Sequence, residues 1–301
     1  MNKKSAYLLG ILLTILVGTV LYYYLCCTCS ACCNDKSSEV LTNTNTTEVQ
    51  KEIFILKGKD IDYRCDTNFN FLNNDFKTIL PVPDSIDLGI EKLKIVLAKK
   101  AQKINITGYC LASEKNKSAF ENLGLARAVD IKNYFVSKGI SAASITTNGV
   151  VKGNLNVDAT TIYGPIDFSI SEISAKTPKE DFTALKAKIN ANPLILYFNT
   201  GQTSIDFSVD DRKKVADMVH YLDNVAEAKI SVTGFTDNVG KIETNIVLGK
   251  DRADFAKNYL VSNGIATNKI DSESKGSEAP IAANETPNGR AKNRRTEVKI
   301  K

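Results

Sequence analysis

Lys229-Ile-Ser-Val-Thr-Gly-Phe-Thr-Asp-Asn-Val-Gly240 is the stretch of sequence that decides the fold. Its first five residues alternate in polarity and include β-branched side chains, which predicts a short strand that ends at Gly234. The segment from Thr236 to Gly240 is typical of a turn, because Asp and Asn side chains bond the local backbone and glycine tolerates unusual φ values. A helical pattern follows over residues 242–263. The stretch therefore predicts a strand, a turn and a helix in succession.

Asp237 and Arg252 are the charged residues that this arrangement brings near one another. Asn245 and Arg252 are seven residues apart, so they share one helical face, about 10 Å apart along the axis. An arginine offers a planar fork to a carboxylate and an aspartate accepts from an ammonium, so the pair suits an amino-acid head group. A direct salt bridge between Asp237 and Arg252, which fixes the turn to the helix, is the alternative that these residues leave open.

A wider set of motifs occurs in the order and spacing that are typical of one protein family. They are Gly234-Phe-Thr-Asp237, Asn245-x-x-Leu248, Arg252-Ala253, Tyr259-Leu260, Gly264-Ile265, Gly276-Ser-Glu278-x-Pro280 and Asn293-Arg-Arg295. Over residues from about 180 to 301, the chain therefore resembles the OmpA-like C-terminal domain.

This resemblance implies non-covalent binding of peptidoglycan, in which Asp237 and Arg252 hold the diaminopimelate of the stem peptide. The sequence departs from the family pattern at Phe235, where His is usual, and at Gly249, where Ser is usual. Both charged residues remain. The resemblance thus implies a ligand pocket formed by Thr236, Asp237, Asn238, Asn245, Leu248 and Arg252.

The first half of the chain repeats this pattern. Residues 123–140 match residues 248–265 at 11 of 18 positions, where average residue usage predicts roughly one. Upstream, Ile104-Asn-Ile-Thr-Gly108 matches Ile230-Ser-Val-Thr-Gly234. We therefore expect two OmpA-like units in tandem, each an α+β sandwich of β-α-β-α-β order with a mixed sheet and two helices on one face. Their predicted bounds are 52–172 and 193–301, joined by a connector with a short helix over 173–192.

The first unit lacks most of the ligand residues of the second. Tyr109-Cys-Leu111 stands where Phe235-Thr-Asp237 stands in the second unit, and Phe120 replaces Asn245. Arg127 is retained, and Glu114 in the same loop is a candidate partner for it. The alternative is that this unit kept its core and lost its ligand, and on that basis we predict a spacer or a protein-contact module.

The N-terminal 33 residues predict a membrane anchor. Ala6 to Leu25 are twenty residues without a charge, which matches the length of a bilayer span. Lys3 and Lys4 precede this segment, so the N-terminus is expected in the cytoplasm and the two units in the periplasm. An uncleaved helical span favours the inner membrane over the outer one. Residues 34–51 are rich in Ser, Thr and Asn and are predicted to be a disordered tether.

A cluster of cysteines follows the predicted span. In an oxidising periplasm these residues favour local disulfides or a homo-oligomer linked through them. An inert cluster, a metal site and lipidation are the alternatives. The cysteines concerned are Cys26, Cys27, Cys29, Cys32 and Cys33.

Other functional classes are disfavoured by the composition. The net charge of +5 is modest, and Arg290-x-Lys292-x-Arg294-Arg295 is too short a basic run to predict nucleic-acid binding. His220 is the one histidine, and no Gly-x-Ser-x-Gly elbow occurs. Ala6 to Leu25 contain no acidic residue that a proton-driven motor needs.

The sequence thus predicts a non-catalytic envelope protein without cofactor or metal, anchored in a membrane, whose partner is peptidoglycan. A periplasmic protein–protein scaffold or a disulfide-linked assembly that has lost wall binding is the alternative. A redox or metal enzyme built on the cysteine cluster is a third class, which a metal analysis of the protein would test.

Overall fold

The structure is a computed structural model that describes Ile15, Val17 and residues 52–99, 102–172 and 180–301. The predicted span at Ala6 to Leu25 lies outside the described residues except for Ile15 and Val17. The cysteine cluster and the tether lie outside them entirely. Among the helices of the described residues, none combines the length and the apolar character needed to cross a bilayer.

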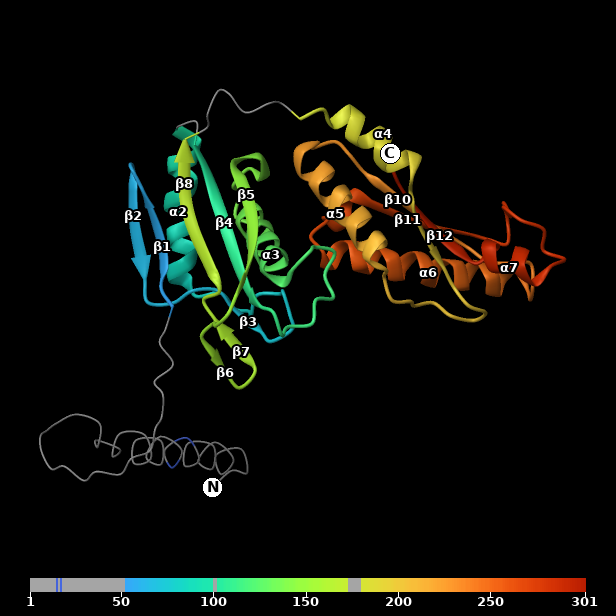
Figure 1. Ribbon diagram of the computed structural model, residues 1–301, viewed down its shortest axis with the longest axis horizontal. Coiled ribbons are helices and arrows are strands. Elements are labelled where there is room, and N and C mark those ends of the chain that lie inside the picture. Colours follow the sequence, from blue (N-terminus) through green and yellow to red (C-terminus); the bar gives the residue numbers. More distant parts are fainter. Residues whose placement is uncertain (1–14, 16, 18–51, 100–101, 173–179) are drawn as a thin grey trace, which may run out of the picture. The chain divides into compact units, whose positions relative to one another are not determined.

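The first lobe, residues 52–172, combines short sheets with helices (Figure 1). Its central sheet has the strand order β5-β4-β8, and smaller sheets are formed by β1-β2 and by β3-β7-β6. The elements are β1 (Phe54–Gly58), β2 (Ile61–Cys65), β3 (Asn70–Leu72), α2 (Asp84–Lys99), β4 (Gln102–Leu111), α3 (Leu123–Ser137), η1 (Ala142–Ser144), β5 (Ile145–Lys152), β6 (Val157–Asp158), β7 (Thr161–Tyr163) and β8 (Ile166–Glu172).

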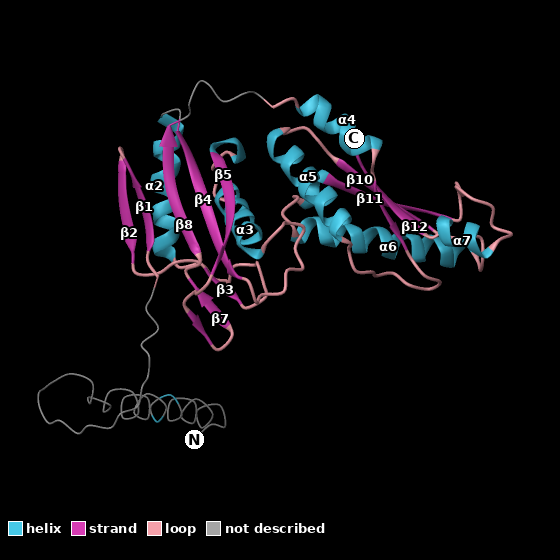
Figure 2. Cartoon of the chain, in the orientation of Figure 1, coloured by secondary structure: helices cyan, strands magenta, loops and turns pink. Residues whose placement is uncertain are grey.

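The second lobe, residues 180–301, has a sheet with the strand order β11-β10-β12-β9 (Figure 2). The strand predicted to end at Gly234 ends at Phe235, and the helix predicted over 242–263 spans Ile242–Ser262. A short helix lies within residues 173–192, as expected, whereas α7 was not predicted. The elements are α4 (Phe182–Ala191), β9 (Leu194–Tyr197), α5 (Val209–Asn224), β10 (Ile230–Phe235), α6 (Ile242–Ser262), η2 (Thr267–Lys269), β11 (Ile270–Gly276), α7 (Pro287–Asn293) and β12 (Arg295–Ile300).

The central strands of the two lobes are paired in the same way. In the first lobe β4 is parallel to β5 and antiparallel to β8. In the second lobe β10 is parallel to β11 and antiparallel to β12. Both lobes therefore have the mixed sheets of an α+β fold. Along β10, Ile230 and Val232 are buried with the apolar side chains of α5 and α6, whereas Ser231 and Thr233 are partly exposed.

Glycines of the repeat allow each helix to approach its central strand closely. A Cβ atom on Gly234 would lie 1.8 Å from the carbonyl oxygen of Gly249 on α6. The first lobe has the same crossing, since a Cβ on Gly108 would lie 2.0 Å from the carbonyl oxygen of Gly124. A Cβ at Gly249 would lie 2.3 Å from Ser274 Oγ, so the Ser274 side chain would have to shift to admit any residue larger than glycine there. The backbone contact thus explains why both copies retain these glycines.

Apolar and polar contacts join the two lobes. One buried cluster contains Phe120 and Leu123 of the first lobe together with the core residues of the second. Ala119 N donates to Asn263 Oδ1 at 2.7 Å, and Arg212 Nη1 donates to the Asn116 carbonyl at 2.7 Å. The loop between β4 and α3 therefore packs on the second lobe, which the periodicity of the sequence gave no means to predict.

Candidate functional site

Asp237 lies in the turn directly after β10 and is buried. Its Oδ2 atom accepts a hydrogen bond from Arg294 Nη1 at 2.8 Å, and its Oδ1 atom accepts from Val239 N at 3.2 Å. The ion pair that the sequence left open between Asp237 and Arg252 is therefore replaced by a pair with Arg294. Arg294 lies where α7 ends and β12 begins, so the tertiary fold brings the two charges together.

Arg252 lies in the middle of α6 and is fully buried. Its Nε donates to the Gln202 carbonyl at 2.8 Å, Nη1 donates to the Phe235 carbonyl at 3.0 Å, and Nη2 donates to the Asn199 carbonyl at 3.2 Å. Burial and, secondarily, the positive charge of Arg294 lower the pKa of Arg252 to about 10, while Asp237 acts in the opposite direction. Arg252 therefore remains a cation at neutral pH.

Two other predicted site residues hold the Asp237 loop in place. Asn245 Nδ2 donates to the carbonyl oxygens of Asp237 at 3.4 Å and of Val239 at 3.2 Å. Thr236 N donates to the Gly276 carbonyl at 2.7 Å, and its hydroxyl donates to the Asp237 carbonyl at 2.9 Å. The side chains of Thr236 and Asn245 are both buried, and their hydrogen bonds are made to the backbone of the loop that carries Asp237.

The remaining predicted residues border the loop. Asn238 is exposed, and Leu248 is half-buried on α6. Val239 and Ile242, which were not predicted as site residues, are exposed apolar side chains on either side of the turn that leads into α6. The site thus combines a buried pair of opposite charges with an apolar border.

Arg294 is the residue of this site that sequence reasoning missed. Its Nε donates to the Phe198 carbonyl at 3.0 Å, which aims Nη1 at Asp237. The signal was present, because Arg294 belongs to the Asn293-Arg-Arg295 motif, to which no role had been given. The neighbouring Asn293 is fully buried and bonds the backbone of the Ile281 and Ala282 loop.

The corresponding arginine of the first lobe has a different ionic partner. Arg127 forms an ion pair with Glu114, and both side chains are buried. Glu114 therefore does pair with Arg127, as one of the two alternatives from the sequence held. By contrast, no carboxylate among the described residues forms a hydrogen bond with the guanidinium of Arg252.

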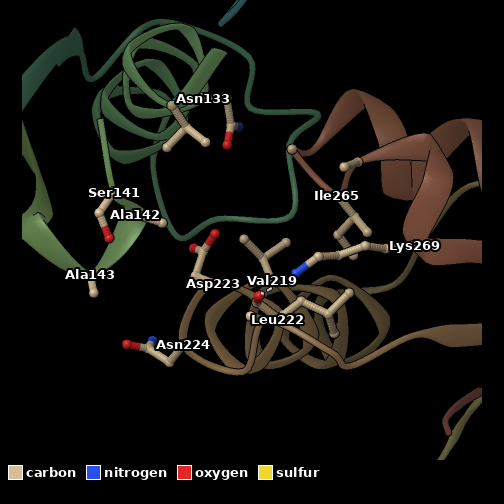
Figure 3. A pocket seen from close by; sticks show the side chains of 14 residues that line it. Asn133, Ser141, Ala142, Ala143, Val219, Leu222, Asp223, Asn224, Ile265 and Lys269 are labelled. Atoms are coloured by element: carbon tan, nitrogen blue, oxygen red, sulfur yellow. Dashed lines mark hydrogen bonds between the residues drawn. The ribbon is translucent and has the colours of Figure 1, made fainter. Parts of the chain in front are cut away.

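The lining of a cavity of about 350 Å³, shown in Figure 3, includes neither Asp237 nor Arg252. Its walls come from α3, η1, the end of α5 and the segment from Gly264 to Lys269. They are largely apolar, and Lys269 Nζ donates to the Leu222 carbonyl at 2.9 Å. None of the six predicted ligand residues lines this cavity, so it offers no support for the predicted pocket.

The described residues contain no cluster of histidine, cysteine and carboxylate side chains that is arranged to hold a metal ion. Cys65 and Cys110 are both free thiols. His220 is exposed, and its Nε2 lies 2.8 Å from Glu180 Oε2. The five clustered cysteines lie outside the described residues.

Comparisons with known proteins match a family model to both lobes and find relatives for part of the chain. A sequence model described as the OmpA family matches residues 83–163 and 197–294, which together make up more than half of the chain. The chain is 36% identical over 126 residues to the peptidoglycan-binding protein ArfA of Mycobacterium tuberculosis, which covers 42% of this chain and 37% of that protein. It is 37% identical over 133 residues to outer membrane protein A of Bordetella avium, covering 42% of this chain and 63% of that protein.

The chain therefore spans less than two thirds of the length of either curated relative. Among solved structures, the peptidoglycan-associated lipoprotein from Burkholderia pseudomallei matches with 25% identity and a TM-score of 0.33, over 36% of this chain and 89% of that one.

Proposed function

This chain belongs to the OmpA family, and we propose that it is a non-catalytic cell-envelope protein that binds peptidoglycan through its second lobe. The observation that carries the proposal is the buried pair of Asp237 and Arg294, which lies beside the cation Arg252. These three groups carry one negative and two positive charges. A carboxylate is therefore attracted to the site, and Asp237 supplies an acceptor for an ammonium group.

The ligand that fits this distribution is an amino acid with both head-group charges, as in the diaminopimelate of a stem peptide. Asp237 directs one oxygen to Arg294 and one to Val239 N, and an ionised carboxylate can accept about four hydrogen bonds. It therefore keeps acceptor capacity for an ammonium. Val239 and Ile242 offer apolar contact to the aliphatic part of such a ligand.

The predicted site residues divide by role under this proposal. Asp237 and Arg252 supply charge, while Thr236 and Asn245 hold the loop that carries Asp237. Asn238 and Leu248, at the border, are the members left to contact the ligand directly. We add Arg294 to the set, because it orients the carboxylate that the ligand needs.

Several reversible contacts suit attachment to a polymer. Each charge-assisted hydrogen bond contributes roughly 1.5–3 kcal/mol, so two or three of them give binding that can still dissociate. Many stem peptides on one wall raise the overall avidity without new contacts. The predicted anchor at residues 1–33 and tether at 34–51 place the second lobe within reach of the wall from the inner membrane.

The two lobes are proposed to be tandem OmpA-like units with the bounds 52–172 and 193–301. Two observations support this view. The strands β4 and β10 each have one parallel and one antiparallel neighbour, and in both lobes a glycine of the central strand lies against a glycine of the following helix. The first lobe serves as a spacer or protein-contact module. Linkage of chains through the cysteine cluster, and the scaffold function that would go with it, stay predictions.

A sedimentation assay with purified sacculi tests the function. The full chain in detergent is expected to sediment with sacculi, and Asp237→Ala is expected to weaken this binding at least about tenfold, which corresponds to about 1.4 kcal/mol. Arg252→Ala is expected to do the same. Circular dichroism checks that each variant is folded.

Arg64→Ala is the control, because Arg64 is an exposed residue on β2 of the first lobe. If folded Asp237→Ala and Arg252→Ala sediment as well as the parent and the control do, the pocket assignment is wrong. If the parent itself does not sediment, wall binding is excluded for this chain.

A further inference from the structure

Arg127 and Arg252 are held by the same backbone frame in the two lobes. Arg127 Nη1 donates to the Tyr109 carbonyl at 2.9 Å, as Arg252 Nη1 donates to the Phe235 carbonyl. Tyr109 and Phe235 are 126 positions apart, the same offset that relates the repeated strands. Nε of Arg127 donates to the Asp75 carbonyl at 3.0 Å, where Nε of Arg252 uses Gln202.

The aromatic support of the two guanidinium groups is also alike. The Arg127 guanidinium lies 5.4 Å from the centre of the Phe71 ring, and that of Arg252 lies 5.1 Å from the centre of the Phe198 ring. The two arginines therefore occupy equivalent positions, and the surroundings of one can be used to interpret the other.

The two guanidinium groups differ in how many N–H donors they use. An arginine has five such donors. Arg127 uses all five, because Asp75 accepts two, Tyr109 accepts one and the Glu114 carboxylate accepts one from each Nη atom. Arg252 uses three among the described residues, all toward backbone carbonyls. Each Nη atom of Arg252 thus has one N–H group without an acceptor among the described residues. These two groups correspond to the N–H groups of Arg127 that donate to the Glu114 carboxylate.

Glu114 also takes two backbone donors. Oε2 accepts from Leu111 N at 2.8 Å and Oε1 accepts from Asn74 N at 3.1 Å. Together with the two bonds from Arg127, these fill the roughly four acceptor positions of a carboxylate. The side chain of Glu114 is 1% exposed, so its carboxylate is enclosed as a bound anion would be.

The second lobe has counterparts of both backbone donors. Leu111 corresponds to Asp237 by the same offset, and Asn74 precedes the Nε acceptor Asp75 as Gly201 precedes Gln202. Neither the Asp237 N–H nor the Gly201 N–H donates to another residue in the described part of the chain. At the two offsets that relate the copies, Glu114 corresponds to Val239 or Gly240, neither of which carries a carboxylate. The second lobe therefore repeats the donors of the Glu114 site without the glutamate.

We propose that Glu114 is an internal ligand, which fills in the first lobe a carboxylate-binding site whose counterpart in the second lobe takes the carboxylate of an external acid. The site in the first lobe consists of the Arg127 fork and the N–H groups of Leu111 and Asn74. The first lobe is closed to external acids because its own side chain supplies all four hydrogen bonds.

In the second lobe, if the proposed function holds, the ligand carboxylate accepts hydrogen bonds from four donors. These are the two Nη atoms of Arg252 and the backbone N–H groups of Asp237 and Gly201. Since Arg252 is fully buried, the carboxylate reaches these donors when the exposed turn at Gly201 moves. Loops at the surface have the low local stability that such a movement needs.

Acetate tests the site in the first lobe directly. The Glu114→Ala substitution in the full chain removes the groups that acetate contains and leaves Arg127 buried without an anion. We expect a lower midpoint of thermal unfolding for this variant. Sodium acetate should then raise its midpoint, with saturation, by more than it raises that of the parent, whereas sodium chloride at equal ionic strength should not.

Two controls define the result. Glu91→Ala removes an exposed glutamate of α2 and should respond to acetate as the parent does. Glu114→Ala/Arg127→Met removes the cation as well and should lose the extra response. An equal acetate response in Glu114→Ala, Glu91→Ala and the parent would overturn the proposal.

If Glu114→Ala is too unstable to purify, its refolding yield from urea is compared in acetate and in chloride. A higher yield in acetate supports the proposal, and equal yields overturn it. The experiment contains no peptidoglycan and leaves the second lobe unchanged. Its outcome is therefore independent of whether the second lobe binds the wall.

Discussion

Arg294 Nη1 donates a hydrogen bond of 2.8 Å to Asp237 Oδ2, and this contact joins residues 57 positions apart in the sequence. The side chains are only 13% and 10% exposed, so the pair is shielded from water and from salt. Asp237 had been expected to act with Arg252. Its orientation is instead set by Arg294, while Arg252 is held by backbone carbonyls.

Replacement of Arg294 by alanine should therefore weaken both folding and wall binding. The buried Asp237 carboxylate would lose its partner, which costs about 3–5 kcal/mol in comparable pairs. Urea titration measures the free energy of unfolding, and sacculus sedimentation measures binding. Arg294→Lys keeps the charge but not the fork that joins Phe198 and Asp237, so it should fall between the parent and Arg294→Ala. Arg64→Ala is the control here as well. If Arg294→Ala has the same free energy of unfolding and the same sacculus binding as this control, the role assigned to Arg294 is wrong.

The glycine crossing of the second lobe should be intolerant of a single methyl group. Gly234→Ala places a Cβ 1.8 Å from the Gly249 carbonyl oxygen, so β10 and α6 must separate. Overpacking of this kind costs typically 1–3 kcal/mol, and a backbone obstacle favours the upper end of that range. Gly153→Ala is the control, since a Cβ there meets no atom within 4 Å. Urea titrations that give equal free energies of unfolding for the two variants would refute the importance of this crossing.

Tyr109 should make the stability of the protein depend on pH in the alkaline range. Burial, reinforced by the hydrogen bond to Asp167, raises the pKa of Tyr109 from 10.0 to about 12. Because the folded-state pKa is the higher one, the contribution is fully present below pH 10 and is lost as the pH rises toward 12. Tyr109→Phe, the aromatic residue that the second lobe has at Phe235, should remove this part of the pH dependence of the unfolding free energy.

Tyrosinate absorbance measures the same effect in the folded protein. The parent should titrate one more tyrosine near pH 12 than Tyr109→Phe does. Tyr197→Phe, which changes an exposed tyrosine of β9, serves as the control. Parallel stability curves for the parent and Tyr109→Phe between pH 10 and pH 12 would contradict the expected effect.

The sequence by itself determined the central strand and the long helix of the second lobe and the resemblance between the two halves. Alternation over Ile230 to Thr233 and the helical spacing after Ile242 are local signals, and local signals fix the type and bounds of an element. The repeated glycines were visible too, because a backbone crossing leaves the same residue in both copies. The sequence also named Asp237 and Arg252, through their motif.

Only the tertiary structure decided which charges meet. Asp237 follows β10 and Arg294 precedes β12, so the sheet brings them together. Glu114, which the sequence offered only as a candidate, reaches Arg127 from a loop whose conformation no periodicity describes. The contacts of Phe120 and Asn263 between the lobes likewise join surfaces far apart in the chain. Which charged side chains pair depends on the direction in which each side chain points and on which polar groups are buried away from water. A sequence motif contains no information on either property. The motif therefore identified Asp237 and Arg252 without identifying the groups that they contact.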